Sequence, residues 1–325
     1  GDPHRNSFRN ASYPQSDPPD DRNFPWQLDG RHKRSIALDL KNEDARTILD
    51  RLLRKADVLI VNFPPPARER LRLRWEDIEP INPRLVYCSL TGYGESGPDR
   101  DRPGFDITAY FGRSGILDSA RYEDGPPGLS LPAQGDRATA MTLVAAILLG
   151  LRRRDQTGKG GWVGTSLYAN GVWANGTSAA GAVIGARLPP RHPPDKPRNA
   201  LTNLYRTKDD RWLQLLMVRD DRLWEKFCAV IERPDLLADA RYAGRPERLK
   251  PGGGMSSGSG RSGCRTHRTK PSSRQTVRAC RPVRVGRSAT SASSRARSGR
   301  VAAIAGCDCF AIRSRIATMH FTAIT

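Results

Sequence analysis

Residues 34–90 alternate between two hydrophobic periods, and this alternation constrains the fold more than any other feature of the chain. One kind of segment alternates apolar and polar side chains or is a short apolar run, as strands are. The other kind repeats apolar side chains at helical spacing, and the first such segment follows Asn42, a predicted N-cap. The expected strands are 34–40, 58–61 and 85–90, and the expected helices are 42–53 and 75–81. Alternation of this kind predicts an α/β layer with a parallel sheet and right-handed crossovers.

The residues after the third expected strand, Gly92 to Gly97, have the spacing G-x-G-x-x-G of a dinucleotide-binding turn. That fingerprint requires a helix to begin at the glycines, because its N-terminal N–H groups hold the pyrophosphate. Pro98 and Pro103 follow in a polar run, so a helix is not expected there. We therefore interpret these glycines as a loop that passes close to another part of the chain, not as a nucleotide motif.

Gly135 and Asp136 lie between an irregular stretch and a nearly all-apolar helix expected from Met141 to Leu151. An aspartate at this position has two interpretations. It can be an N-cap, because Asp is a preferred cap and offsets the helix dipole. It can also be a carboxylate nucleophile, kept ionised by the same dipole. Position alone favours the cap, because caps are far commoner than nucleophiles.

Residues 251–325 differ sharply in composition from the rest of the chain. They carry 14 Lys and Arg residues, one acidic residue and no Leu, and they account for most of the net charge of +20. A basic arm for nucleic acid, a disordered solvated tail and translation in a wrong reading frame all fit this composition. We favour the wrong frame, because the change near residue 250 is abrupt. Cys307 and Cys309 lack a second pair at zinc spacing, so no metal site is expected.

Four parts are expected along the chain. A large domain covers residues 1–185, a Pro-rich linker covers 186–200, and a partial small α+β domain covers 201–250, followed by the basic tail at 251–325. The small domain should contain a hairpin around Asp209 and Asp210 and a helix from Leu223 to Ile231. No apolar run is long enough to cross a bilayer and no signal peptide is visible, so we expect a cytoplasmic protein.

Several motifs of the chain occur in the order found in one enzyme family. They are Gly1 to Arg5, Arg34 to Lys41, Asn62-Phe63, Gly92 to Asp106, Gly135-Asp136 and Thr157 to Gly160. Together they resemble the class III CoA-transferases, also called the CaiB/BaiF family, whose relatives include formyl-CoA transferase, carnitine CoA-transferase and alpha-methylacyl-CoA racemase. The resemblance extends from residue 1 to about Arg248. It implies a Rossmann-like large domain and transfer of CoA from an acyl-CoA thioester to a carboxylic acid.

The resemblance also implies roles for particular residues. Asp136 stands at the position of the family's catalytic aspartate, which forms an aspartyl-CoA intermediate. Asp106 stands at that of a carboxylate near the reaction centre, although its residue type and position favour a loop cap. The positions implied for CoA binding are Leu38, Lys41, Asn62, Phe63, Arg70 and Leu71. From their residue types alone, Lys41 and Arg70 fit a solvated basic face equally well, and Phe63 fits a core position. CoA is expected as a substrate, with no permanently bound cofactor and no metal.

Departures from the family pattern leave alternatives open. Racemase relatives have a histidine directly before the Asp106 position, whereas this chain has Phe105, which cannot transfer a proton. Transferase is thus favoured over racemase, and a non-catalytic basic protein that binds nucleic acid is the alternative from another class. The family's first strand and helix and the second half of its small domain are missing here. We therefore expect a truncated chain that is less active than full-length members and forms the family's interlocked homodimer less readily.

Overall fold

The computed structural model describes residues 24–128, 130–188, 190–193, 201–206, 212–216, 220–248, 301–305 and 319–324. The chain divides into two compact units. The first contains residues 1–120, 128–188 and 294–325, and the second contains 121–127 and 189–293. The change of unit at residue 188 falls inside the Pro-rich segment expected as a linker. The motif at residues 1–5, the cysteines at 307 and 309, the turn at Asp209-Asp210 and most of the basic tail lie outside the described residues.

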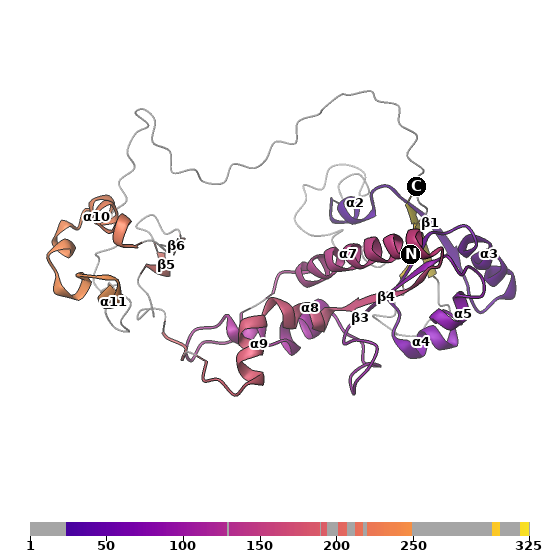
Figure 1. The fold of residues 1–325 in the computed structure, drawn as a ribbon, viewed down its shortest axis with the longest axis horizontal. Helices are drawn as coiled ribbons and strands as arrows, with labels where there is room; N and C mark the ends of the chain where they lie inside the picture. The colour runs from indigo at the N-terminus through magenta and orange to yellow at the C-terminus, as the bar shows by residue number, and fades with distance from the viewer. Residues whose placement is uncertain are drawn as a thin grey trace, which may run out of the picture. The chain divides into compact units, whose positions relative to one another are not determined.

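A six-stranded sheet forms the centre of the first unit (Figure 1). Its order is β1 (Lys33–Leu38), β8 (Met319–Ile324), β7 (Val301–Ala305), β2 (Val58–Val61), β3 (Val86–Thr91) and β4 (Gly161–Ser166). Strands β7, β2, β3 and β4 run parallel, as the sequence predicts for β2 and β3, whereas β8 is antiparallel to both of its neighbours. The sheet is therefore mixed and not wholly parallel.

Two strands from the basic tail separate β1 from β2, a feature that the sequence did not predict. The tail was expected to be disordered or out of frame, yet its segments 301–305 and 319–324 are strands. Both segments are short apolar runs within Arg- and Ser-rich text, and such runs have the length and composition that a sheet position accepts. An expectation of disorder drawn from average composition therefore does not apply to these two segments.

Helices cover the two faces of the sheet, because successive strand residues point to opposite sides. On one face, Leu59, Val61 and Tyr87 pack in a core with Leu49 and Leu53. On the other face, Val58, Val86, Cys88 and Leu143 form a second core. The helices of this unit are α2 (Phe24–Gly30), α3 (Glu43–Leu53), α4 (Pro65–Arg70), α5 (Trp75–Ile78), the π-helix η1 (Asp106–Arg113), α6 (Ile116–Ser119), α7 (Gln134–Thr157), α8 (Leu167–Ala174) and α9 (Gly176–Val183). The result is a three-layer arrangement of the α/β class that the sequence predicted.

The expected helix at 42–53 is α3, and its cap is as predicted. The Asn42 side chain accepts a hydrogen bond of 2.8 Å from the backbone N–H of Asp44. The apolar stripe is only partly buried, because Ile48 and Leu52 remain exposed while Arg46 is buried. Hydrogen bonds compensate the loss of water at the buried Arg46 guanidinium, which donates to Asp50 Oδ1 at 2.8 Å and to the carbonyl of Arg72 at 2.7 Å.

Helix α7 begins two turns earlier than the sequence predicted and ends at Gly158, whose φ of +74° is the left-handed C-cap geometry. It was expected to be a buried core helix. Instead Met141 is 69% exposed and Leu149 is 67% exposed, because the sheet covers one side of the helix only. Near its C-terminus Arg154 contacts Asp57 at 2.9 Å, directly before β2. Among the described residues, no helix is long and apolar enough to cross a membrane.

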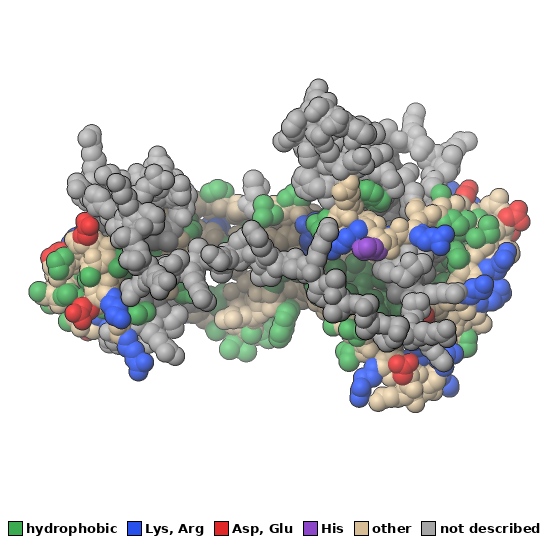
Figure 2. All heavy atoms as spheres, turned by 90° about the horizontal axis from the view of Figure 1, so that it is seen from above, with side chains coloured by type: hydrophobic (Ala, Val, Ile, Leu, Met, Phe, Trp, Pro, Cys, Tyr) green, Lys and Arg blue, Asp and Glu red, His purple; other side chains and the backbone are tan. Residues whose placement is uncertain are grey.

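The second unit contains the hairpin and helix that the sequence predicted. Strands β5 (Thr202–Arg206) and β6 (Trp212–Leu216) pair antiparallel. They are followed by α10 (Asp220–Val230), the 3-10 helices η2 (Pro234–Leu237) and η3 (Ala240–Tyr242), and α11 (Arg245–Arg248). The core of this unit consists of Leu201, Trp224, Cys228, Leu236 and Tyr242. Figure 2 shows that apolar side chains lie among the charged ones on the described surface, as is normal for folded proteins.

Candidate active site

Asp136 is the third residue of α7, and it is not the N-cap that position alone favoured. The N-cap is Ala133, whose φ is +59° and which makes no side-chain capping bond. Asp136 is an exposed residue in the first turn, where the helix dipole stabilises a negative charge. The cap interpretation was wrong because the helix begins at Gln134, two residues before Asp136.

Gly135 permits the first turn of α7 to lie directly on the ring of Tyr110. A Cβ atom at Gly135 would lie 2.6 Å from Tyr110 Cγ, a distance that carbon atoms do not adopt without a shift. Tyr110 belongs to η1, which is also packed against α8, because a Cβ at Gly171 would lie 2.2 Å from the Tyr110 carbonyl oxygen. The two glycines thus hold η1 between α7 and α8 at close range.

Asp106 is the first residue of η1 and is only 7% exposed. Its Oδ1 accepts a hydrogen bond of 2.7 Å from the backbone N–H of Ile107. Its Oδ2 is buried and has no hydrogen-bond partner among the described residues. Such an atom is costly, and π-helices are frequent at functional sites. Phe105, the residue directly before it, is 47% exposed.

The two aspartates interact electrostatically. The pKa of Asp136 lies above its ordinary value, mainly because neighbouring atoms partly desolvate the carboxylate and also because the charge of Asp106 opposes its ionisation. Arg137 acts in the opposite direction. A carboxylate that loses water contacts in this way is a stronger nucleophile than one in bulk solvent.

The structure brings together three of the six residues that the resemblance implied for CoA binding. Leu38 and Phe63 are both 6% exposed and belong to the same core, against which Leu71 packs. The packing role that the residue type of Phe63 allowed is therefore the one the structure gives it. Contact of these residues with CoA stays a prediction.

The other three implied residues lie at the surface near the ends of β1 and β2. Lys41 is exposed, and its backbone N–H donates to Asp39 Oδ1 at 3.1 Å. Asn62 is exposed directly after β2, and Arg70 is exposed as the last residue of α4. Lys41 and Arg70 are thus accessible to an anionic ligand.

The glycine-rich segment after β3 is a loop, as predicted. No helix begins between Gly92 and Phe105, and Gly94 and Gly97 adopt φ values of +107° and +90°. A Cβ at Gly92 would lie 2.6 Å from the Cα of Gly104, so the loop passes close to the segment that leads into Asp106. This close approach is the role that the sequence assigned to these glycines.

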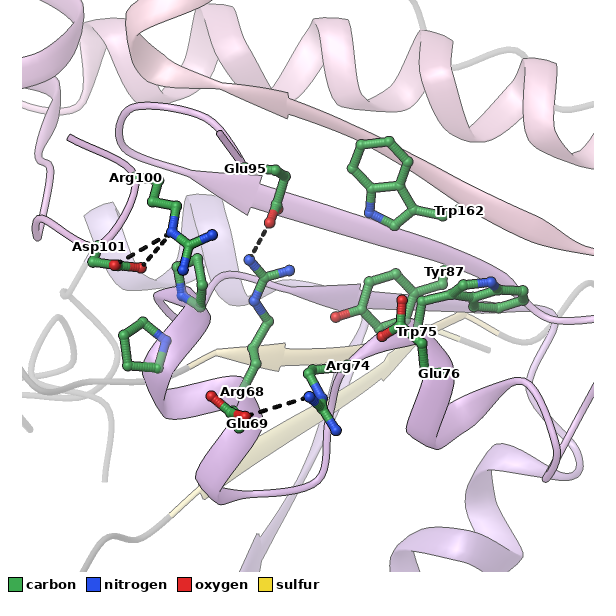
Figure 3. Close-up of a pocket in the computed structure, with 12 residues that line it drawn as sticks. Arg68, Glu69, Arg74, Trp75, Glu76, Tyr87, Glu95, Arg100, Asp101 and Trp162 are labelled. Atoms are coloured by element: carbon green, nitrogen blue, oxygen red, sulfur yellow. Dashed lines mark hydrogen bonds and ion pairs between the residues drawn. The ribbon is translucent and has the colours of Figure 1, made fainter. Parts of the chain in front are cut away.

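A pocket of about 550 Å³ lies beside this loop, away from both aspartates (Figure 3). Its side chains come from α4, α5, β3, β4 and the loop. They are Pro65, Pro66, Arg68, Glu69, Arg74, Trp75, Glu76, Tyr87, Glu95, Arg100, Asp101 and Trp162. Three arginines and four acidic residues nearly balance in charge, so this pocket does not select an anion or a cation. Sequence reasoning missed it, because nothing local links α4 with a loop 27 residues later.

Comparisons with known proteins identify the family of this chain. The model of the CoA-transferase family III matches residues 1–256. The chain belongs to this family. It is 34% identical over 223 residues to (R)-2-hydroxy-4-methylpentanoate CoA-transferase of Clostridioides difficile, a match covering 69% of this chain and 55% of that protein. It is also 34% identical over 256 residues to cinnamoyl-CoA:phenyllactate CoA-transferase of Clostridium sporogenes, covering 78% of this chain and 60% of that protein.

A solved structure gives the same assignment for the fold of this family III chain. A CaiB/BaiF family protein from Brucella suis superposes with a TM-score of 0.57 at 28% identity, over 65% of this chain and 55% of that one. The family and the α/β fold expected from the motifs are therefore confirmed. The chain spans little more than half the length of these relatives.

Proposed function

We propose that this chain carries the catalytic carboxylate of a CoA-transferase, which moves CoA from an acyl-CoA thioester to a carboxylic acid. The observation that supports it most is the position of Asp136. In a family III chain, this carboxylate is exposed in the first turn of a long helix, next to a second carboxylate that raises its pKa. A nucleophile needs this combination of access and reduced solvation.

The reaction proceeds in two symmetrical halves. The Asp136 carboxylate attacks the thioester carbonyl, the C–S bond breaks, and a mixed anhydride and free CoA thiolate form. The thiolate then attacks the Asp136 carbonyl carbon, which releases the donor acid as its carboxylate and leaves an aspartyl-CoA thioester. The acceptor carboxylate repeats these two steps in reverse, so CoA leaves on the acceptor and Asp136 returns to its ionised form. Splitting one exchange in this way lowers each barrier.

CoA itself is the substrate that the exposed basic residues fit. Lys41 and Arg70 are accessible and suit phosphate groups, and Leu71 provides apolar surface beside Arg70. Leu38, Asn62 and Phe63 complete the proposed CoA-binding set, with Phe63 acting chiefly by packing. The acceptor is a carboxylic acid, and 2-hydroxy acids are the first to test because both relatives are named for such acids.

Hydroxylamine trapping tests the covalent role of Asp136. The protein is incubated with an acyl-CoA and then with hydroxylamine, which breaks the C–S bond of an aspartyl thioester and leaves a hydroxamate that mass spectrometry can locate. We expect the modification on Asp136 and no CoA transfer by Asp136→Ala. Asp155→Ala is the matched control, because Asp155 is an exposed aspartate in the same helix. An Asp136→Ala protein that still transfers CoA would falsify the assignment.

Proton exchange separates transferase from racemase. Phe105 stands where racemase relatives have a proton-transferring histidine, so we expect no exchange of the acyl α-proton in deuterated water. Exchange at a rate that matches turnover would favour a racemase instead.

We also propose a homodimer, with the exposed side of α7 in its interface. Met141, Leu148 and Leu149 are more than 60% exposed on a helix whose opposite side packs on the sheet. A helix that is apolar on both sides is normally covered on both sides. We expect Leu148→Lys to convert a dimer into a monomer in light scattering. A wild-type chain that is monomeric at assay concentrations would contradict the proposal.

A further inference from the structure

Arg68 and Glu95 form an ion pair that ties α4 to the glycine-rich loop. Figure 3 shows the Arg68 side chain extending from α4 to the Glu95 carboxylate, past Tyr87. The Arg68 side chain is 6% exposed and that of Glu95 is 31% exposed, so the pair is shielded from water on the arginine side. No other ion pair given for the described residues joins α4 to this loop.

The pair connects two segments that the proposed reaction uses. Arg68 lies two residues before Arg70, at the end of the segment proposed to hold CoA. Glu95 lies in the loop whose first glycine, Gly92, touches Gly104, two residues before Asp106. The contacts therefore run from α4 through the loop to Asp106, the buried aspartate whose charge acts on Asp136.

The chemistry of the pair is better suited to fixing geometry than to adding stability. Arg68 Nε and Glu95 Oε1 are both buried and have no hydrogen-bond partner among the described residues. Burial lowers the pKa of Arg68, but its hydrogen bonds with Glu95 and Tyr87 outweigh that effect and keep the guanidinium charged. Apolar side chains of similar volume generally stabilise the folded state at least as much as a buried ion pair in the same place does.

The loop is also held at its two ends: the Tyr168 N–H donates to the Gly92 carbonyl at 2.9 Å, and Arg113 donates to Asp99 Oδ2 at 3.1 Å. The Arg68–Glu95 pair restrains the part of the loop between these two contacts.

Gly94 and Gly97 have positive φ values, which glycine adopts at little cost. Because glycine has no Cβ, the backbone at these two positions is less restricted sterically than at other residues. The loop's internal anchor is the hydrogen bond of 2.9 Å from Gly94 N–H to Thr91 Oγ1. Beyond Gly94, the Glu95 side chain reaches α4.

We infer that Arg68 and Glu95 are a positioning pair, which holds the loop at 92–97 and thereby aligns Asp106 with the CoA-binding segment. This inference rests on the proposed CoA-transferase function. The pair touches neither CoA nor the reacting carboxylate and acts through the Gly92–Gly104 contact.

A double replacement separates positioning from stability. Arg68→Met alone and Glu95→Leu alone each leave one charge without its partner, so both should lower the thermal midpoint. Combining Arg68→Met with Glu95→Leu should restore the midpoint to near the wild-type value. We expect kcat/KM to remain about tenfold to a hundredfold low in the double variant, because a misplacement near 1 Å has effects of that size. Arg68→Lys, which keeps the charge, should recover part of the loss.

Hydrogen exchange gives a readout that does not depend on activity. We expect amides at 92–106 to exchange faster in the double variant, while those of α3 are unchanged. The matched control is Arg72→Met with Glu43→Leu, an exposed Arg–Glu pair at 2.9 Å whose loss should change neither kinetics nor exchange at 92–106. Wild-type exchange and kinetics in the Arg68/Glu95 double variant would overturn the inference. A wild-type protein without CoA transfer would instead overturn the proposed function, and the exchange result would still decide whether the pair holds the loop.

Discussion

Replacing Gly135 by alanine tests the geometry of the candidate site most directly. The new Cβ would lie 2.6 Å from Tyr110 Cγ and 2.8 Å from Tyr110 Cβ. Carbon atoms in contact are ordinarily about 3.5–4.0 Å apart. The ring or the first turn of α7 must therefore move by about 1 Å. Because Asp136 is the next residue, it moves with that turn.

The expected change in stability is small, whereas the expected change in activity is large. Overpacking costs about 1–3 kcal/mol, and alanine is better than glycine in a helix by about 1 kcal/mol, which leaves about 0–2 kcal/mol of destabilisation. That corresponds to a fall of about 0–8 °C in the thermal midpoint, at about 2–4 °C per kcal/mol for a unit of this size. A displacement of about 1 Å at the nucleophile should lower kcat/KM by about a hundredfold.

The assay compares CoA transfer and thermal unfolding of Gly135→Ala with those of Gly176→Ala. Gly176 is also in the first turn of a helix, and a Cβ there would meet nothing within 4 Å. The control should be as active as the wild type and at least as stable. If Gly135→Ala transfers CoA at the wild-type rate, the close packing of α7 on Tyr110 does not position Asp136, and the reasoning is refuted.

Three further perturbations follow from other contacts. The charge of Asp106 contributes to the raised pKa of Asp136, so Asp106→Asn should lower that pKa. In an NMR titration the Asp136 carboxyl should then ionise at lower pH than in the wild type. An unchanged or higher pKa would count against the coupling. Asn42→Ala removes the cap of α3 and should cost about 1 kcal/mol in urea unfolding, and no measurable loss would contradict the capping bond. Burial raises the pKa of the Cys88 thiol to about 12, so iodoacetamide at pH 8 should leave Cys88 unmodified in the folded protein and alkylate it in urea.

Local patterns predicted β1 and α3 well, although in β1 only Leu38 is buried. The period-2 pattern located β1 to within two residues, and Asn42 correctly marked the start of α3. The prediction for α7 was wrong in its start because Gln134 to Ala140 lacks an apolar period, and tertiary contact with Tyr110 extends the helix there. Strand–helix alternation predicted the α/β class, because it depends only on such local periods.

Long-range pairing could not be predicted in this way. Nothing near β1 indicates that it pairs with residues 319–324, and nothing near Arg68 indicates Glu95. Family motifs identified Asp136 and Asp106, whose proximity depends on how η1 packs against α7. The cap interpretation of Asp136 failed because the helix starts three residues earlier than that interpretation requires, which is an ordinary error for a boundary predicted from sequence.

Helix α7 is fixed at both ends, by the contact of Arg154 with Asp57 near its C-terminus and by the packing of Gly135 on Tyr110 beside Asp136. Eighteen residues separate the two ends, so at 1.5 Å per residue the helix between them is about 27 Å long. A rotation of only about 2° at the Arg154 end displaces Asp136 by about 1 Å, given the helical rise. A substitution at Asp57 that tilted α7 by this angle would therefore displace Asp136 without contacting it, and the packing of Gly135 on Tyr110 opposes such a tilt.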